Sequence, residues 1–217
     1  MTDKITVGSL VLEIHQDEFP PNPRTEQDNL GKMVLYQKRY DLPNELRIDI
    51  EGSRSWQDLY ERLDKEFDCR VILPVYMMDH SGLTFRCGHG FGDVDPQQWD
   101  WGQVGFIAAI RKDILENFTG YDGNKREPMK QRISKKMLET TTRILRGEVE
   151  LYNKYANGEC YFYRLYDMKR AIAAGGLDAT PQDFIETVGG FYSIEDIATS
   201  VPKQFRKRLE QHDFDRE

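Results

Sequence analysis

Two ionisable residues stand where a strongly apolar stretch gives way to a Ser-Gly turn. Asp79 and His80 directly follow the apolar run 71–78. Carboxylates and an imidazole can ligate a divalent ion or form an acid/base pair, and loops at strand ends often carry reactive groups. Asp28 and Asp100 are the carboxylates that could complete a metal site, and a small metal-dependent hydrolase would use such a set. The opposing interpretation is structural, with both side chains hydrogen-bonded to the backbone of the turn.

A second group of metal-ligand types lies in a glycine-rich stretch and comprises Cys87, His89, Asp93 and Asp95. Its spacing lacks the C-x2-C or H-x3-H pattern of a zinc site, so it favours a loop over a metal cage. The chain also contains no G-x-S-x-G elbow and no phosphate-binding glycine loop, which argues against a serine hydrolase or a nucleotide-binding protein. A divalent metal is the one cofactor the sequence suggests, and otherwise none is expected.

Aromatic and polar residues near these groups are candidates for binding. Trp99 and Trp101 flank Asp100, so in a strand both indoles would lie on one side. Such aromatics more often anchor a core or a loop than bind a ligand. A proline-rich stretch must form a loop, and its Arg24 can pair with Asp28 to pin it. The candidate binding residues are Arg24, Asp28, Asn29, Trp99, Asp100 and Trp101.

Charge is distributed unevenly along this chain of net charge −7. Residues 1–100 hold eleven basic and nineteen acidic residues, whereas 125–146 hold eight basic and two acidic residues. Because each phosphate contact needs a Lys or Arg, the net charge disfavours broad nucleic-acid binding, and no sequence-specific binding is expected. The acidic half predicts a protein partner reached through Asp58, Glu61 and Asp64. The basic segment is either a solvated helix face or a docking surface for an acidic partner.

The elements that must position these residues follow from periodicity. Apolar spacing predicts helices over 55–67 and 134–155, with a helical turn at 114–118. Strands are expected near Ile5, Met33, Val71, Leu83, Val104, Tyr161 and Val188. Together they predict one α+β domain over 1–200, with a mixed or antiparallel sheet and two main packed helices. Residues 201–217 are expected to form a polar helix or tail.

Composition places the chain among folded proteins of the cytoplasm. It is 39% hydrophobic and 12% aromatic, and no apolar run approaches the roughly 20 residues that span a bilayer. The N-terminal residues lack the layout of a signal peptide, so no membrane association is expected. Three widely spaced cysteines argue against a disulfide framework.

Five stretches of the chain resemble an uncharacterised family of bacteriophage and mobile-element proteins. They are residues 21–24, 28–34, 73–82, 99–105 and 189–192, and the third reads Leu-Pro-x-Tyr-x-x-Asp-His-Ser-Gly. The chain departs from the family at Trp101, where a small residue is usual, and 171–182 look like an insertion. The resemblance implies a phage-encoded accessory protein and supplies no mechanism.

Three classes of function stay open on this basis. The first is a phage-encoded binding protein that inhibits a host nucleic-acid-processing or defence complex in the host cytoplasm. The second is the metal-dependent hydrolase, and the third is a structural or assembly factor of unknown oligomeric state. We also expect Asn22, Arg24, Asp28 and Asn29 to approach Asp79, His80 and Asp100, because buried polar residues of loops need partners.

Overall fold

The computed structural model describes residues 2–119, 132–173 and 184–209. Contacts group the chain into two compact units, Met1–Asn22 with Gly158–Glu217, and Pro23–Asn157. Each unit combines a four-stranded antiparallel sheet with helices, which confirms the expected α+β class. The strands expected to share one sheet are divided between two, because those near Ile5, Tyr161 and Val188 pair only among themselves in the described part of the chain.

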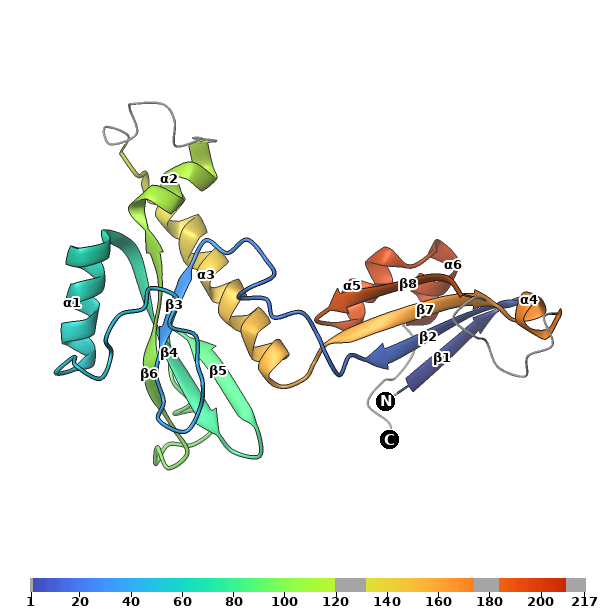
Figure 1. Ribbon diagram of the computed structural model, residues 1–217, viewed down its shortest axis with the longest axis horizontal. Helices are drawn as coiled ribbons and strands as arrows, with labels where there is room; N and C mark the ends of the chain where they lie inside the picture. Colours follow the sequence, from blue (N-terminus) through green and yellow to red (C-terminus); the bar gives the residue numbers. More distant parts are fainter. Residues whose placement is uncertain (1, 120–131, 174–183, 210–217) are drawn as a thin grey trace. The chain divides into compact units, whose positions relative to one another are not determined.

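The sheet of the unit Pro23–Asn157 has the order β3-β6-β4-β5 (Figure 1). Its strands are β3 (Lys32–Leu35), β4 (Cys69–Asp79), β5 (Leu83–Cys87) and β6 (Trp101–Ile110). β4 and β6 lie inside the sheet, where both faces are covered, so nearly continuous apolar runs suit them. The expected central strand over 71–78 is therefore confirmed.

Helices cover both faces of this sheet. Helix α1 (Trp56–Phe67) packs through Leu59 and Leu63 against one face, and α3 (Lys135–Ala156) packs through Leu145 and Val149 against the other (Figure 1). A short helix, α2 (Arg111–Thr119), follows β6 where a helical turn was expected. The two faces of the sheet contribute to two separate hydrophobic cores. Neighbouring residues of β3 point to opposite faces because the strand is pleated, and they therefore enter different cores.

Serine caps set the first residues of the two main helices. The side chain of Ser55 accepts a hydrogen bond from the backbone N–H of Asp58, and Ser134 accepts one from Met137. A hydroxyl at this position satisfies one of the backbone donors that the first helical turn leaves free. Both helices agree with the prediction to within one residue at each end.

The second unit has the sheet order β1-β2-β7-β8. Its strands are β1 (Thr2–Val7), β2 (Leu10–Gln16), β7 (Tyr161–Asp167) and β8 (Phe184–Phe191). Its helices are α4 (Met168–Ala173), α5 (Ile194–Ser200) and α6 (Lys203–Leu209). The segment expected as a polar helix or tail does form a helix, α6, but Phe205 and Leu209 of this helix are buried with Leu12 and Tyr163, so it supplies core residues.

Parts of three predictions lie outside the described residues, namely 125–131 of the basic segment, 174–182 of the stretch that looks like an insertion, and 210–217 of the expected helix or tail. No helix within the described ranges is long and apolar enough to cross a bilayer.

Candidate functional site

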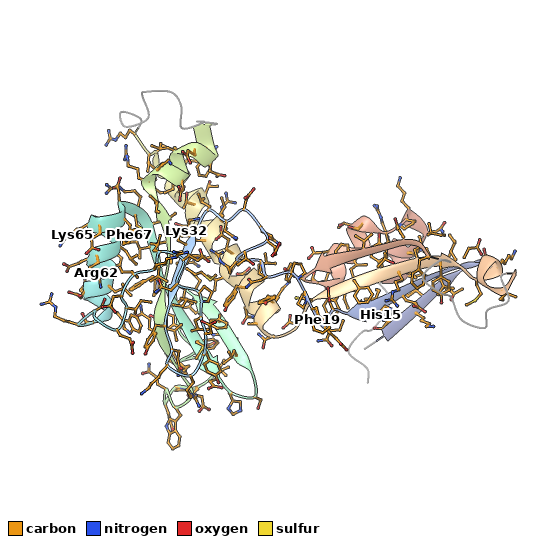
Figure 2. All side chains as sticks on the ribbon, in the orientation of Figure 1. His15, Phe19, Lys32, Arg62, Lys65 and Phe67 are labelled. Atoms are coloured by element: carbon orange, nitrogen blue, oxygen red, sulfur yellow. The ribbon has the colours of Figure 1, made fainter. Side chains whose placement is uncertain are left out.

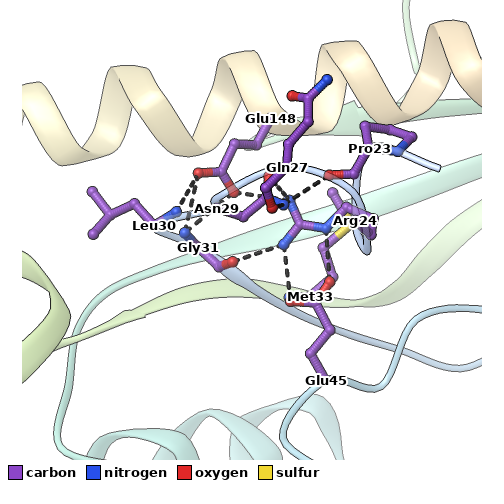
Figure 3. A network of polar contacts seen from close by, with 9 residues as sticks. All are labelled: Pro23, Arg24, Gln27, Asn29, Leu30, Gly31, Met33, Glu45 and Glu148. Carbon is purple, nitrogen blue, oxygen red and sulfur yellow. Dashed lines mark hydrogen bonds and ion pairs between the residues drawn. The ribbon is translucent and has the colours of Figure 1, made fainter. Parts of the chain in front are cut away.

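A buried arginine organises the loop that precedes β3 (Figure 3). The Nε and Nη2 atoms of Arg24 donate to the two carboxylate oxygens of Glu45 at 2.7 and 2.9 Å. Nη1 donates to Glu148 of α3 and to Asn29, each at 2.9 Å, and Nη2 also donates to the carbonyl of Gly31 at 2.7 Å. Arg24 thereby ties its own loop to α3 and to the segment after β3.

The electrostatics of this network match its burial. The side chain of Arg24 is only 2% exposed. Burial alone would lower the pKa of Arg24, but the carboxylates of Glu45 and Glu148 outweigh burial and raise it. Glu148 also accepts hydrogen bonds from the backbone N–H groups of Leu30 and Gly31. Each nitrogen of the Arg24 guanidinium donates to an acceptor of the protein, which is typical of a structural network rather than of a reactive centre.

Gly31 permits this close approach of the loop to α3. A Cβ atom there would lie 2.8 Å from Cδ1 of Ile107 and 2.9 Å from Oε2 of Glu148. The carboxylates that hold Arg24 are those of Glu45 and Glu148, and the sequence reasoning had selected neither. It had selected Asp28, which is exposed.

Asp79 ends β4 and binds a neighbouring loop. Its Oδ2 atom accepts a hydrogen bond from the hydroxyl of Tyr40 at 2.8 Å and pairs with the guanidinium of Arg39. Its backbone N–H donates to the carbonyl of Asp100 at 2.8 Å. The structural interpretation of Asp79 is thus supported, although the partners of its carboxylate are side chains rather than backbone groups of the turn.

His80 and Asp100 meet as one pair. Nδ1 of His80 lies 3.0 Å from Oδ2 of Asp100, and both side chains are largely exposed. Across the described residues, no three His, Cys, Asp or Glu side chains gather as they would around a metal ion. The four residues of the expected metal site are therefore not gathered among the described residues. Asp79 and Asp100 have different partners. Arg24 contacts Glu45, Glu148 and Asn29 in a separate network.

Asp95 organises the loop between β5 and β6, which we call the Trp99 loop (residues 88–100). Its carboxylate accepts hydrogen bonds from the backbone N–H groups of Trp99 at 2.7 Å, Gln97 at 3.1 Å and Asp100 at 3.3 Å. Burial would raise the pKa of Asp95, but these N–H groups outweigh it and lower the pKa. Its carbonyl also accepts a hydrogen bond from the indole of Trp101 at 2.7 Å.

Trp101 anchors the loop to the sheet. Its ring packs edge-on against Tyr76 at 5.9 Å and at a tilt against Phe91 at 6.1 Å, both between ring centroids. Gly90 lies directly on the indole, since a Cβ there would meet the ring at 2.0 Å. The guanidinium of Arg86 stacks over Phe91 and pairs with Asp93 at 2.6 Å. The C-x-H-x3-D-x-D group is thus divided, with Asp93 paired to Arg86 of β5 and Asp95 bonded to backbone groups of the loop.

Trp99 behaves differently from Trp101, although only one residue separates them. Trp99 precedes β6, and 80% of its surface is exposed, as is 57% of that of Val94 in the same loop. The two indoles therefore do not share a face as they would in a strand. A fixed backbone that presents an exposed indole is an arrangement that can bind a partner.

Comparison with protein-family models, curated proteins and solved structures found no match. The resemblance to phage proteins therefore stays a prediction, and the site must be interpreted from its own geometry.

The acids expected to form a partner surface lie on α1 and are partly neutralised. The ion pairs are Asp58–Arg54 at 2.7 Å, Glu61–Lys65 at 3.0 Å and Asp64–Arg70 at 3.9 Å. Figure 2 labels Arg62 and Lys65 among the cations of this helix. Exposed pairs of this kind contribute little stability, but they reduce the net field of the face. The surface of α1 is mixed in charge rather than acidic.

Proposed function

We propose that the protein is a phage-encoded accessory protein that binds, and thereby inhibits, a protein of a host nucleic-acid-processing or defence complex. One observation carries the binding part of this proposal. The Trp99 loop holds a largely exposed indole on a backbone fixed by Asp95 and Trp101. The phage origin is supported by the sequence resemblance alone.

An exposed tryptophan on an ordered loop suits protein recognition for two physical reasons. The indole offers a large apolar area together with one N–H donor, so tryptophan is enriched among residues that dominate binding energy. The hydrogen bonds from Trp99, Gln97 and Asp100 to Asp95 order the backbone before binding, which lowers the entropy lost on association. The fold of the unit does not need this indole, because most of it contacts solvent.

The test uses Trp99→Ala and a matched exposed aromatic. Tagged wild-type protein, Trp99→Ala and Phe19→Ala are each used to capture proteins from a host lysate, and any protein retained by the wild type is purified. Phe19 is 89% exposed and labelled in Figure 2, so its removal controls for general stickiness. Loss of a central tryptophan should weaken the direct affinity by about 2 kcal/mol or more, roughly 30-fold.

Two results decide the proposal. A partner whose affinity falls with Trp99→Ala and is unchanged with Phe19→Ala would support the binding part of the proposal. Inhibition of that partner's activity by the wild type but not by Trp99→Ala would support the inhibition part. If every captured protein binds Trp99→Ala as tightly as the wild type, the loop is not the binding surface and the proposal fails.

The hydrolase keeps one supporting observation, the pairing of His80 with Asp100, because a carboxylate partner orients an imidazole for proton transfer. A chelator that lowers the melting temperature, or hydrolysis abolished by Asp100→Asn, would favour it. The assembly factor has no comparable observation, and self-association in solution is its test.

A further inference from the structure

Three of the four sheet edges in the described chain have hydrogen-bond partners outside their sheet. The backbone N–H of Phe85 in β5 donates to the side chain of Asn153 of α3 at 2.7 Å. The carbonyl of Thr6 in β1 accepts a hydrogen bond from Arg208 of α6 at 2.9 Å. Strand β3 bonds through its backbone to the loop at 43–45. Such partners keep the free backbone groups of an edge strand from pairing with another chain.

Strand β8 forms the fourth edge, and its outer side is open. Apart from its ladder with β7, no hydrogen bond to its backbone is found among the described residues. Residues 184–191 contain neither Lys nor Pro, which commonly protect an exposed edge, and 50% of the surface of Ile185 is exposed. The pairing with β7 is regular from Glu186 to Val188, between two register shifts, so this short stretch can accept a further strand.

A guanidinium without an acceptor lies beside this edge. Arg164 of β7 is paired with Thr187 of β8, and its guanidinium carbon lies 5.1 Å from the ring centres of both Phe162 and Phe184. Its Nε atom is buried without a hydrogen-bond partner, and no hydrogen bond or ion pair of Arg164 is found in the part of the chain that the structure describes. The two rings order the guanidinium before binding, and a carboxylate with two oxygens matches its N–H groups.

The acids nearest to Arg164 in the sheet are bound to other groups. Glu13 is paired with Arg164 across β2 and β7, but its carboxylate binds Lys4 at 2.7 Å and the hydroxyl of Tyr166 at 2.9 Å. Glu186 of β8 accepts a hydrogen bond from a tyrosine hydroxyl of the core at 2.9 Å. The charge of Glu13 is therefore offset by Lys4, and Arg164 keeps donors that no acid of its own sheet uses.

We infer that the open edge of β8 binds an extended, acidic segment of a partner protein by strand addition. The free N–H and C=O groups of β8 call for the backbone of an extended strand, which supplies both kinds of group in register. Strands lie about 4.8 Å apart, so the Cα atom of a residue added beside Thr187 lies about 10 Å from that of Arg164, a distance that a glutamate and an arginine span together. Asp17 lies near Gly189 and would repel an acid at that end, so the acid of the partner belongs beside Thr187.

A second copy of β8 fits this edge less well than an acidic partner. The one acid of β8, Glu186, is already bonded to Tyr163, so a second copy leaves Arg164 without a carboxylate. The edge belongs to the unit that does not contain Trp99, so the inference stands without the proposed function.

The test is a titration of the full chain into fluorescein-labelled, backbone-cyclised β-hairpin peptides, followed by anisotropy. The first hairpin alternates threonine and valine along its free strand and carries one central glutamate. The second has glutamine in place of this glutamate, and the third keeps the glutamate but carries N-methyl groups on the outward amides of the free strand. The proteins are the wild type, Arg164→Met and Lys207→Met, of which the last removes an exposed cation of α6 in the same unit. Thermal unfolding of each protein is measured in parallel.

The glutamate hairpin should bind the wild type and Lys207→Met equally, and should bind Arg164→Met at least about tenfold more weakly because a charged hydrogen bond is lost. The glutamine hairpin should also bind the wild type about tenfold more weakly, yet should bind Arg164→Met as tightly as the glutamate hairpin does, because both changes remove the same contact. The N-methylated hairpin should not bind, since its outward amides cannot donate. Binding should slow amide hydrogen exchange at 184–191 and leave residues 2–7 unchanged.

Several results would overturn the inference. These are no binding of the glutamate hairpin by the wild type up to about 1 mM, equal binding of the N-methylated hairpin, or the same preference for glutamate over glutamine in Arg164→Met as in the wild type. A wild type that sediments as a dimer and is protected at 184–191 without peptide would assign the edge to a second copy. Loss of hairpin binding in Trp99→Ala would place the peptide on the Trp99 loop and would also overturn the inference.

Discussion

Replacing Arg24 by methionine should strongly destabilise the unit Pro23–Asn157. Methionine keeps an unbranched apolar side chain but removes the donors to Glu45, Glu148, Asn29 and the carbonyl of Gly31. Breaking a buried ion pair by removing one partner costs about 3–5 kcal/mol, because a buried charge is left uncompensated. Glu45 is 21% exposed and Glu148 keeps two backbone donors, so the lower end, about 3 kcal/mol, is expected.

The assay is urea unfolding followed by tryptophan fluorescence. All three tryptophans lie in Pro23–Asn157, so the signal reports on this unit alone. With a slope of about 2 kcal/mol per molar urea, the midpoint should fall by about 1.5 M. The control Arg54→Met removes an exposed cation and should change stability by less than about 0.5 kcal/mol.

A second substitution separates charge from packing. Adding Glu148→Gln to Arg24→Met neutralises one of the stranded carboxylates and should recover part of the lost stability. If Arg24→Met unfolds at the same urea concentration as Arg54→Met, the network contributes no net stability, and our interpretation that it stabilises the unit Pro23–Asn157 is refuted.

Three further predictions concern other parts of the chain. Asp95→Ala should speed amide hydrogen exchange at Trp99, because it removes the carboxylate that accepts this N–H, and unchanged exchange would contradict the ordered loop. Burial raises the pKa of Cys69 to about 12 and of Cys87 and Cys160 to about 11, so a thiol reagent at pH 8 should label all three much more slowly before unfolding than after it. Burial raises the pKa of Glu13, but hydrogen bonds from Lys4 and Tyr166 outweigh burial and lower the pKa. The stability that Glu13 contributes is therefore present above the pKa of the unfolded chain, about 4.3, and is lost as the pH falls below that value. Glu13→Gln should therefore flatten the loss of thermal stability in that range, measured by circular dichroism.

Local patterns allowed the two main helices to be predicted, but not α4 or α5, whereas the sheets depended on distant partners. The faces of α1 and α3 and their serine caps are encoded within each segment, so periodicity sufficed. The division into two sheets is decided by pairings such as Leu12 with Leu165, which lie far apart in sequence. No spacing rule within a strand indicates which strand will be its neighbour.

The same limit explains what was missed in the candidate site. Asp79 was predicted to be important from its place at the end of a buried strand, and it does bind a neighbouring loop. Glu148, the partner of Arg24, lies 124 residues away along the chain. One signal could have found it, because Glu148 is adjacent to the buried stripe of α3, where a carboxylate needs a cation or several donors. That signal would indicate that Glu148 needs a cation, but it would not indicate which one.

Trp99 and Trp101 show how the same residue type takes two roles within one loop and the strand that follows it. Trp101 fills space against Tyr76 and Phe91, whereas Trp99 contacts mainly solvent. In proteins whose other elements are locally consistent, residues that break a local rule without a gain in packing tend to mark function. The proposed binding role therefore depends on Trp99, and a partner that binds Trp99→Ala as tightly as the wild type would remove the reason for it.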